Sequence, residues 1–522
     1  MKKSFKYIII CLITLGFTGC ADYLDEVPVT SVSVDVIFES EEGLEVGLIA
    51  LYNLQRRNNF PSFGDSGGSS TRQNLFFMVA HDLGHTRTWH RPYGTGHTPT
   101  GFGNLKWTRP YAIIDRASAI IHAAQNVEME SADRNRIMAE AKMFRAENYF
   151  DLLRMYDRIL LDTIPVTPEN ANDPQDFTPA DEADVYATIT SDLDFAIQHL
   201  DYDVELGKYG QGVARHIRGK IAMWQGDWAE AASQFDNIID DGTHALVSSV
   251  SQVFAQNKDH SESLLVYPRN QELGGGENTA GGGGTWFSSI LNNRAYEMSD
   301  NQIVQSIDYG GQSLGWSFPN DYLQSLYDQD NDLRYSTYYY PLPKFVNNTD
   351  HVNFGQEVVY DDNFRRHHFS LKKYHDEEKN LFGLDQWNDI IYYRFAETLL
   401  LGAEAHWRND SENSANAKAL EYVNMVRRRA YNVSDATYDY TEFTLDNYLE
   451  ESARELAFER NRWFLLKRMG ILVERQNLHY TYGSNSGNIV VEPMEPHMVR
   501  LPIPQDQLDL MGGTFPQNEG YF

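Results

Sequence analysis

The sequence predicts a mostly α-helical fold built from antiparallel helix pairs, together with two long segments that lack helical periodicity. In residues 389–409, apolar and small side chains recur every three or four residues and share one face of a helix (Tyr393, Ala396, Leu400, Ala403 and Trp407). A break at residues 409–411 separates it from a second helix beginning near Ser414. Residues 211–241 repeat the pattern, which is typical of tetratricopeptide-like hairpins that share a continuous core.

Composition narrows the possible functions. The chain has 522 residues, enough for one large domain or two to three ordinary ones. Its formal net charge of −30 disfavours binding to nucleic acid phosphates. Aromatic residues make up 13% of the chain, a level that suits stacking on polar ligands. The two cysteines both lie in the first twenty residues, which excludes a disulfide framework or a cysteine metal site in the body of the protein.

The N-terminus has the pattern of a lipoprotein signal peptide. Lys2, Lys3 and Lys6 precede an apolar run over residues 7–17, which is short for a membrane span. Thr18 and Gly19 come directly before Cys20, as in a lipobox. We therefore expect residues 1–19 to be removed and Cys20 to carry the lipid that anchors the chain. The alternative is an ordinary signal peptide with an incidental cysteine.

The other elements follow in chain order. Helices are expected over 38–55, 111–124 and 134–156, from Asp181 onward, and over 211–241, where Gln225-Gly226-Asp227 forms the turn. Segments 56–109 and 246–385 are expected to be irregular, and residues 471–522 to form an extended tail. The glycine-rich run at 274–284 lacks the Lys-Ser/Thr of a phosphate-binding loop.

A charged helix expected over residues 448–470 has two interpretations. Its apolar side chains alternate with acidic and basic ones, among them Glu455, Glu459 and Arg462. These charges could form exposed pairs on a solvated helix face, each contributing a few tenths of a kcal/mol. They could instead be paired in the interior, because aromatic residues surround them on all sides. Periodicity alone leaves both open.

Three stretches resemble the SusD/RagB family. RELAFERNRWFLLKRMG (454–470) is similar to its C-terminal signature, IMAEAKMFRAENYFDLLRMY (137–156) to its long central helix, and RLPIPQDQLDLMGGTFPQNEGYF (500–522) to its terminus. The chain departs from the family pattern at Ser452, where arginine is common, at Arg460, where glycine is common, and at Leu465, where aspartate is common.

The resemblance implies a fold, a function and a location. Members of this family are surface lipoproteins of Bacteroidota that bind nutrients, usually glycans, without cleaving them. The implied fold is one SusD-like domain over residues 20–522, in which a tetratricopeptide-like scaffold (about 30–245 and 386–470) carries a large irregular, loop-rich ligand-binding face. The implied location is the outer face of the outer membrane. The implied partner is a SusC-like TonB-dependent transporter that receives the oligosaccharide.

The sequence gives little support for catalysis or metal binding. The chain has no H-E-x-x-H motif and no G-x-G-x-x-G after a strand, so an enzyme is not expected. His81 and His85 are spaced to share a helix face, with His90 and His97 nearby. Gly84 and the loop character argue against that helix, so neither a metal site nor a cofactor is expected.

The candidate glycan-binding residues lie in the two irregular segments. An aromatic ring can stack on the apolar face of a sugar while polar side chains bond its hydroxyls. The first segment offers Trp89, His90, Tyr93, Asn104 and Trp107, and the second offers Trp286, Tyr309 and Trp316. For each aromatic taken singly, core packing is the competing interpretation.

Residues 83–110 contain no acidic residue in an otherwise acidic chain. The basic residues there are Arg87, Arg91, Lys106 and Arg109, with histidines at 85, 90 and 97. They could pair with acidic residues elsewhere in the fold. They could instead bind an anionic ligand, such as a uronic-acid or sulfated glycan, through charge-assisted hydrogen bonds. The second interpretation adds Arg87 and Arg91 to the candidate glycan-binding residues.

Three other functions remain open at this point. A peptide-binding protein of the same family would have a ligand face poor in exposed aromatics. A glycan-degrading enzyme would have a pair of carboxylates across a deep cleft. A pure scaffold would have all its aromatics buried.

Overall fold

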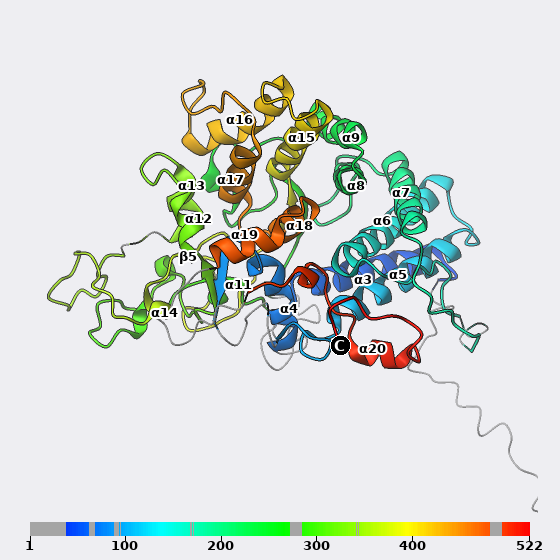
Figure 1. The fold of residues 1–522 in the computed structure, drawn as a ribbon, viewed down its shortest axis with the longest axis horizontal. Helices are drawn as coiled ribbons and strands as arrows, with labels where there is room; N and C mark the ends of the chain where they lie inside the picture. The colour runs from blue at the N-terminus through cyan, green and yellow to red at the C-terminus, as the bar shows by residue number, and fades with distance from the viewer. Residues whose placement is uncertain are drawn as a thin grey trace, which may run out of the picture.

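The computed structural model describes residues 38–61, 68–87, 93, 96–167, 170, 172–271, 284–340, 342, 344–480 and 493–522. It has one half made of long helices and one half made of short elements (Figure 1). The helical half contains α3 (Glu41–Asn59), α5 (Leu105–Ala124), α6 (Ser131–Tyr156), α7 (Glu182–His199), α8 (Gln211–Gln225), α9 (Trp228–Asp241), α15 (Phe395–Asn409), α16 (Ala417–Tyr431) and α17 (Leu445–Leu456).

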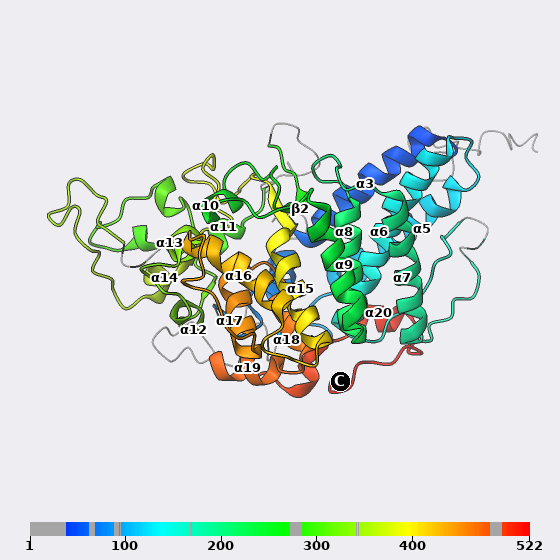
Figure 2. The same cartoon turned by 90° about the horizontal axis from the view of Figure 1, so that it is seen from above.

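The long helices form one continuous row. Consecutive helices from α5 to α9 pack against each other, and α3 packs on α5. The row then continues from α9 to α15 and on to α16, although about 150 residues separate α9 from α15 in the sequence. Figure 2 shows α8, α9, α15 and α16 side by side. Residues 246–385 are therefore an insertion between two neighbouring helical hairpins, and the predicted mostly α-helical fold is confirmed.

The turn between α8 and α9 forms as predicted. α8 ends at Gln225, and Gly226 adopts a left-handed backbone with φ of 75°. Glycine takes this conformation without the steric cost that a Cβ would bring. The side chain of Asp227 then caps α9 by accepting the N–H of Glu230 at 3.1 Å.

The insertion consists of short elements. They are α10 (Val250–Val253), β2 (Ser263–Tyr267), α11 (Phe287–Ile290), η6 (Ala295–Glu297), η7 (Ile307–Tyr309), β3 (Ser317–Pro319), α12 (Asp321–Ser325), α13 (Leu333–Thr337), β4 (Tyr339–Tyr340), α14 (Phe364–His367), β5 (Ser370–Leu371) and β6 (Ile390–Arg394). β2 pairs antiparallel with β6 and β4 with β5. The β2–β6 ladder ties the chain leaving the scaffold to the chain returning to it.

The prediction that all of residues 56–109 are irregular is wrong in part. The segment contains α4 (Gly68–Val79) and the first turn of α5, which begins at Leu105. Phe76 and Phe77 of α4 are buried and contact the ring of Trp463. This contact, made by a residue almost 400 positions away, stabilises a helix that local periodicity does not indicate.

The C-terminal segment is also more helical than predicted. In place of an extended tail, the described part of residues 471–522 contains α19 (Leu472–His479), η8 (Pro496–Val499) and α20 (Gln505–Leu510). Their short apolar faces bury Leu472, Met498 and Leu508 against the main core. Each helix is too short to show a clear period in the sequence, so tertiary packing decides its formation.

The single helix expected over residues 448–470 is broken. α17 ends at Leu456 and α18 spans Arg462–Arg468, because Phe458 and Arg460 have φ of 65° and 72°. This backbone region favours glycine, and position 460 is one where the chain carries arginine in place of the glycine common in similar sequences. Arg460 Nη1 donates to the carbonyl of Asn59 at 2.8 Å, a contact that holds the strained residue in place.

The charges of α17 lie in the interior. Glu455 is fully buried and accepts hydrogen bonds from Arg429, Arg394 and Arg334 at 2.6, 2.7 and 3.0 Å. Arg334 belongs to α13 and Arg394 to β6, whereas Arg429 belongs to α16 of the scaffold. Glu459 accepts from Lys373 at 2.6 Å and Arg394 at 2.7 Å. The interior interpretation is therefore confirmed, and this network joins the insertion to the scaffold.

A second buried ion pair ties the first irregular segment to α18. Asp82 is fully buried and accepts from Arg462 at 2.8 and 2.9 Å. Arg475 of α19 donates to the same carboxylate at 3.1 Å. The residues that follow Asp82 form β1, so this pair positions the start of the strand described next.

Candidate ligand-binding site

A short ladder joins the two irregular segments. β1 (Gly84–Thr86) pairs antiparallel with β3, with His85 opposite Phe318 and Thr86 opposite Ser317. One residue further on, the backbone N–H of Arg87 donates to the carbonyl of Trp316 at 2.8 Å. The ladder therefore places two residues of the predicted site, far apart in the sequence, next to each other.

Trp286 and Trp316 form a pair of partly exposed rings. Their ring centroids lie 6.4 Å apart, with an interplanar angle of 56°. Both residues are half-buried, and the indole N–H of Trp286 donates to Asp385 at 3.0 Å. The backbone N–H of Trp316 donates to the carbonyl of Ile290 in α11 at 2.9 Å. Both tryptophans are thus held by hydrogen bonds and retain partly exposed side chains, as expected for rings that stack on sugars.

Tyr309 lies in the same part of the insertion but is more restrained. Its hydroxyl donates to the carbonyl of Phe345 at 2.9 Å, and the ammonium of Lys344 lies 5.0 Å from its ring centroid. The side chain of Asn292 donates to the carbonyl of Tyr309 at 2.7 Å, and the carbonyl of Asn292 accepts the N–H of Gly315, next to Trp316. Tyr309 is half-buried and packs on a small separate cluster within the insertion.

Arg87, Arg294 and Arg365 gather beside Trp316, and we call them the arginine cluster. The guanidinium of Arg365 donates to the carbonyl of Leu314 at 2.9 Å, and the N–H of Arg294 donates to the carbonyl of Arg365 at 2.7 Å. Burial and then the charge of Arg294 lower the pKa of Arg87. Burial and then the charges of Arg87 and Arg294 lower the pKa of Arg365. The three side chains are therefore close enough to repel one another.

The other predicted site residues that the structure describes are not part of the tryptophan pair or the arginine cluster. Tyr93 is 1% exposed and its hydroxyl donates to the carbonyl of Ala80 at 2.7 Å, so it is a core residue and its assignment to the ligand face is wrong. Trp107 is 3% exposed and packs edge-on against Tyr156 in the core, so its assignment is also wrong. Asn104 precedes α5 and its amide donates to Asp506. Trp89, His90, Arg91 and Cys20 lie outside the described residues.

The acid-free stretch does not form one basic surface. Lys106 is buried, and its ammonium donates to the carbonyl of Asn58 and the side chain of Asn74, both at 2.8 Å. Arg109 donates to the carbonyl of Arg57 at 2.8 Å. Of the described basic residues in this stretch, Arg87 is the one whose backbone is hydrogen-bonded to the tryptophan pair, at Trp316. Sequence reasoning missed its partners in the cluster, Arg294 and Arg365, because they come from a segment with ordinary charge balance.

Of the histidines considered as metal ligands, His81, His85 and His97 are core residues. His81 and His85 are each 1% exposed, one in a turn and the other in β1, so they do not share a helix face. Burial lowers the pKa of His81 to about 4 and that of His85 to about 3, which keeps both rings neutral. Within the described ranges, no group of three or more His, Cys, Asp or Glu could hold a metal ion.

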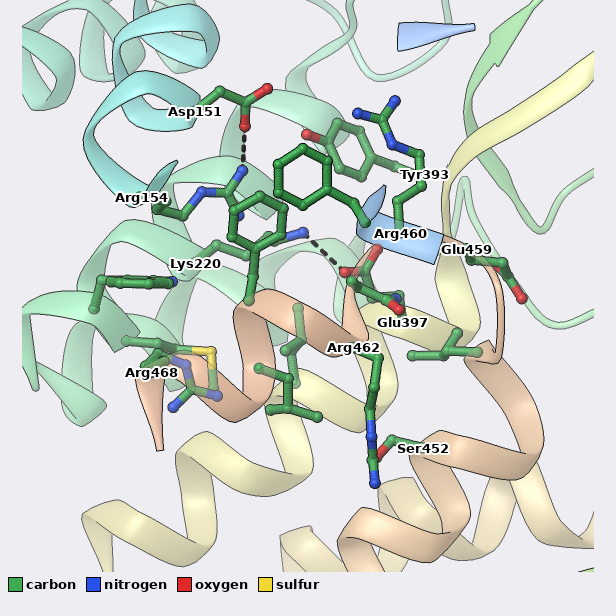
Figure 3. A pocket seen from close by; sticks show the side chains of 18 of the residues that line it. Asp151, Arg154, Lys220, Tyr393, Glu397, Ser452, Glu459, Arg460, Arg462 and Arg468 are labelled. Carbon is green, nitrogen blue, oxygen red and sulfur yellow. Dashed lines mark hydrogen bonds and ion pairs between the residues drawn. The ribbon is translucent and has the colours of Figure 1, made fainter. Parts of the chain in front are cut away.

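A separate interior cavity of about 70 Å³ lies between α6 and the C-terminal helices (Figure 3). Two ion pairs line it: Asp151 with Arg154, and Glu397 with Lys220 at 2.8 Å. The charges of these four residues are therefore paired inside the scaffold. In the part of the chain that the structure describes, no helix is both long and apolar enough to cross a membrane.

Comparison with known proteins defines the family. A model described as "SusD family" matches residues 296–521, and one described as "Starch-binding associating with outer membrane" matches residues 22–210. The chain belongs to the SusD family. Arg87 lies within the second match, whereas Tyr309 and Trp316 lie within the first.

Relatives and solved structures agree with this assignment. A SusD-like protein of Formosa agariphila is 23% identical, and the alignment covers 100% of both chains. A SusD-like protein of Bacteroides ovatus is 23% identical over 88% of this chain and 81% of its own.

The fold matches a structure titled "Laminarin binding SusD-like protein", with a TM-score of 0.70 and 22% identity over 92% of this chain and 100% of that chain. It also matches surface glycan-binding protein A from Bacteroides thetaiotaomicron in complex with laminarihexaose. The TM-score is 0.68, and the identity is 18% over 92% of this chain and 99% of that chain.

Proposed function

We propose that this protein is a cell-surface lipoprotein that binds oligosaccharide or polysaccharide without cleaving it. In this proposal a SusC-like TonB-dependent transporter receives the bound glycan. Membership of the SusD family supports the proposal, as do the titles of two structural neighbours, one a laminarin-binding protein and the other a glycan-binding protein with laminarihexaose.

The observation that carries the proposal is the Trp286–Trp316 pair. Two partly exposed rings 6.4 Å apart can contact adjacent apolar sugar faces, while Asp385 and Arg87 offer an acceptor and donors for the hydroxyl rim. A ligand face with partly exposed tryptophans favours a glycan over a peptide. It also disfavours a pure scaffold, in which these rings would be buried.

Replacing either tryptophan with alanine should weaken glycan binding. Loss of a stacking ring is expected to reduce affinity by about tenfold or more, because such anchors dominate binding energy. Because both half-buried rings also pack against the main core, the melting temperature of each variant is measured to check that it is folded at the assay temperature. Binding is measured with the Cys20-deleted protein against a polysaccharide panel, first by affinity electrophoresis and then by calorimetry.

Trp228 provides the matched control for this experiment. It is also half-buried but lies on α9 in the scaffold, near Arg408 and Arg468. Trp228→Ala should leave glycan binding unchanged. Normal binding by both the Trp286→Ala and Trp316→Ala variants would show that the site is elsewhere. Release of reducing ends by the pure protein would reject noncatalytic binding.

The lipid anchor is tested separately. Cys20→Ala should abolish incorporation of a labelled fatty acid and move the protein from the membrane fraction to the soluble fraction, because acylation of the thiol supplies the anchor. Cys11→Ala is the control, since this cysteine lies within the apolar run of the signal peptide and should leave labelling unchanged. Unchanged labelling of the Cys20→Ala variant would contradict the anchor.

A further inference from the structure

The arginine cluster differs from the ion-paired arginines in the interior of this protein. Arg334, Arg394, Arg429, Arg462 and Arg468 each have a carboxylate oxygen within 3.0 Å. In the cluster, Arg294 pairs with Glu297, and no carboxylate among the described residues is paired with Arg87 or Arg365. The sequence contains 74 acidic residues, and most of the buried arginines are paired with them, although Arg460 instead donates to the carbonyl of Asn59. The cluster is an exception to that pattern.

The geometry fixes the cluster beside the tryptophan pair. Arg87 follows β1, and its N–H is bonded to the carbonyl of Trp316. Arg365 binds the carbonyl of Leu314, two residues before Trp316, and Arg294 is bonded to Arg365 through the backbone. The Nε atoms of all three arginines are buried and lack a hydrogen-bond partner among the described residues.

Each arginine of the cluster is partly exposed, with the side chain of Arg294 20% exposed. Like charges held together repel one another, and partial burial strengthens that repulsion relative to water. A bound anion would offset this repulsion between the three guanidinium groups. Guanidinium groups bind carboxylate and sulfate-like oxygens with directed, often paired, hydrogen bonds.

We propose, on the basis of the proposed glycan-binding function, that the arginine cluster binds an anionic substituent of the glycan while Trp286 and Trp316 stack on its sugar rings. The substituent is a sulfate ester or a uronic-acid carboxylate, which present the same oxygen chemistry to the three guanidinium groups. The site thus selects acidic glycans over neutral glycans of the same backbone.

The test uses matched pairs of polymers. κ-Carrageenan is compared with its chemically desulfated form, and polygalacturonate with its methyl ester, so that the two pairs separate sulfate from carboxylate. Calorimetry with the Cys20-deleted protein should show that at least one acidic polymer binds about tenfold or more tightly than its neutral partner. Raising the salt concentration should weaken that binding, because screening acts over about 8 Å at physiological ionic strength.

Arg87→Gln and Arg365→Gln should each remove roughly tenfold of the preference for the acidic polymer and flatten its salt dependence. Arg366→Gln is the matched control: it adjoins Arg365 in α14 but pairs with Asp361, and it should change neither quantity. Melting temperatures of the three variants check that each is folded.

The outcomes separate this inference from the proposed function. Salt-independent binding to neutral polymers that depends on Trp286 or Trp316, with both arginine variants unaffected, would overturn the inference and leave the proposed function standing. Binding to an acidic polymer that is insensitive to Arg87→Gln and Arg365→Gln would also overturn it. Absence of binding to any polysaccharide would overturn both.

Discussion

Replacing Glu455 with alanine should lower the free energy of unfolding by about 3–5 kcal/mol, because it removes one side of a buried charge network. Glu455 accepts hydrogen bonds from Arg334, Arg394 and Arg429, all at 3.0 Å or less, and is 0% exposed. Without this carboxylate, the buried guanidinium groups of Arg334, Arg394 and Arg429 lose a negatively charged partner. Denaturant titration followed by circular dichroism measures the change.

An exposed pair provides the comparison. Glu421 of α16 lies 3.6 Å from Lys418 on the surface and is 57% exposed. Glu421→Ala should cost about 1 kcal/mol or less, as is usual for solvated pairs. If Glu455→Ala also costs less than about 1 kcal/mol, the buried network does not stabilise the fold as described. Glu459→Ala should behave like Glu455→Ala, because Lys373 and Arg394 lose their shared partner.

The same network predicts how stability changes in acid. Burial by itself would raise the pKa of Glu451, but Arg334, Arg454 and Arg427 together lower it to about 2. Burial by itself would also raise the pKa of Glu455, but Arg429, Arg394 and Arg334 lower it well below its usual value. Since the folded-state pKa values are depressed, this stabilisation is complete above the unfolded-state value of about 4.3 and is lost as the pH falls toward 2. Glu455→Ala should therefore lose stability less steeply over that range.

Replacing Asp82 with asparagine should also cost about 3–5 kcal/mol. Asp82 accepts two hydrogen bonds from Arg462 and one from Arg475, and asparagine cannot neutralise these guanidinium groups. Since Asp82 lies just before β1, the variant should also weaken glycan binding through displacement of Arg87 from Trp316. Denaturant titration and calorimetry measure the two effects.

Asp157 is the matched control for Asp82. It also pairs with two basic residues, Lys467 at 2.7 Å and Arg500 at 2.5 Å, but its side chain is 37% exposed. Asp157→Asn should cost about 1 kcal/mol or less and leave binding unchanged. Equal effects of the two substitutions would contradict the positioning role of the buried pair.

The helical hairpins could be read from the sequence because their signals are local. The 3.6-residue period of residues 211–241 and 395–431, the glycine at 226 and the capping aspartate at 227 each act within a few residues. The prediction that the helix already begins near residue 389 is wrong, because residues 390–394, with Tyr393 among them, form strand β6 in a ladder with the distant β2. The resemblance of residues 454–470 to a family signature added the fold class. It also marked Arg460 as unusual, and the structure shows that this residue occupies a left-handed backbone conformation.

The make-up of the site depended on contacts that the sequence could not reveal. Tyr93, Trp107, Trp286 and Trp316 all lie in the segments expected to be irregular, yet the first two are core residues and the last two are half-buried beside each other. Which of them is exposed depends on pairing between β1 and β3, more than 200 residues apart. The arginine cluster likewise combines residues from positions 87, 294 and 365. Local periodicity therefore determined the scaffold, and tertiary structure decided the ligand face, because exposure is a property of long-range packing.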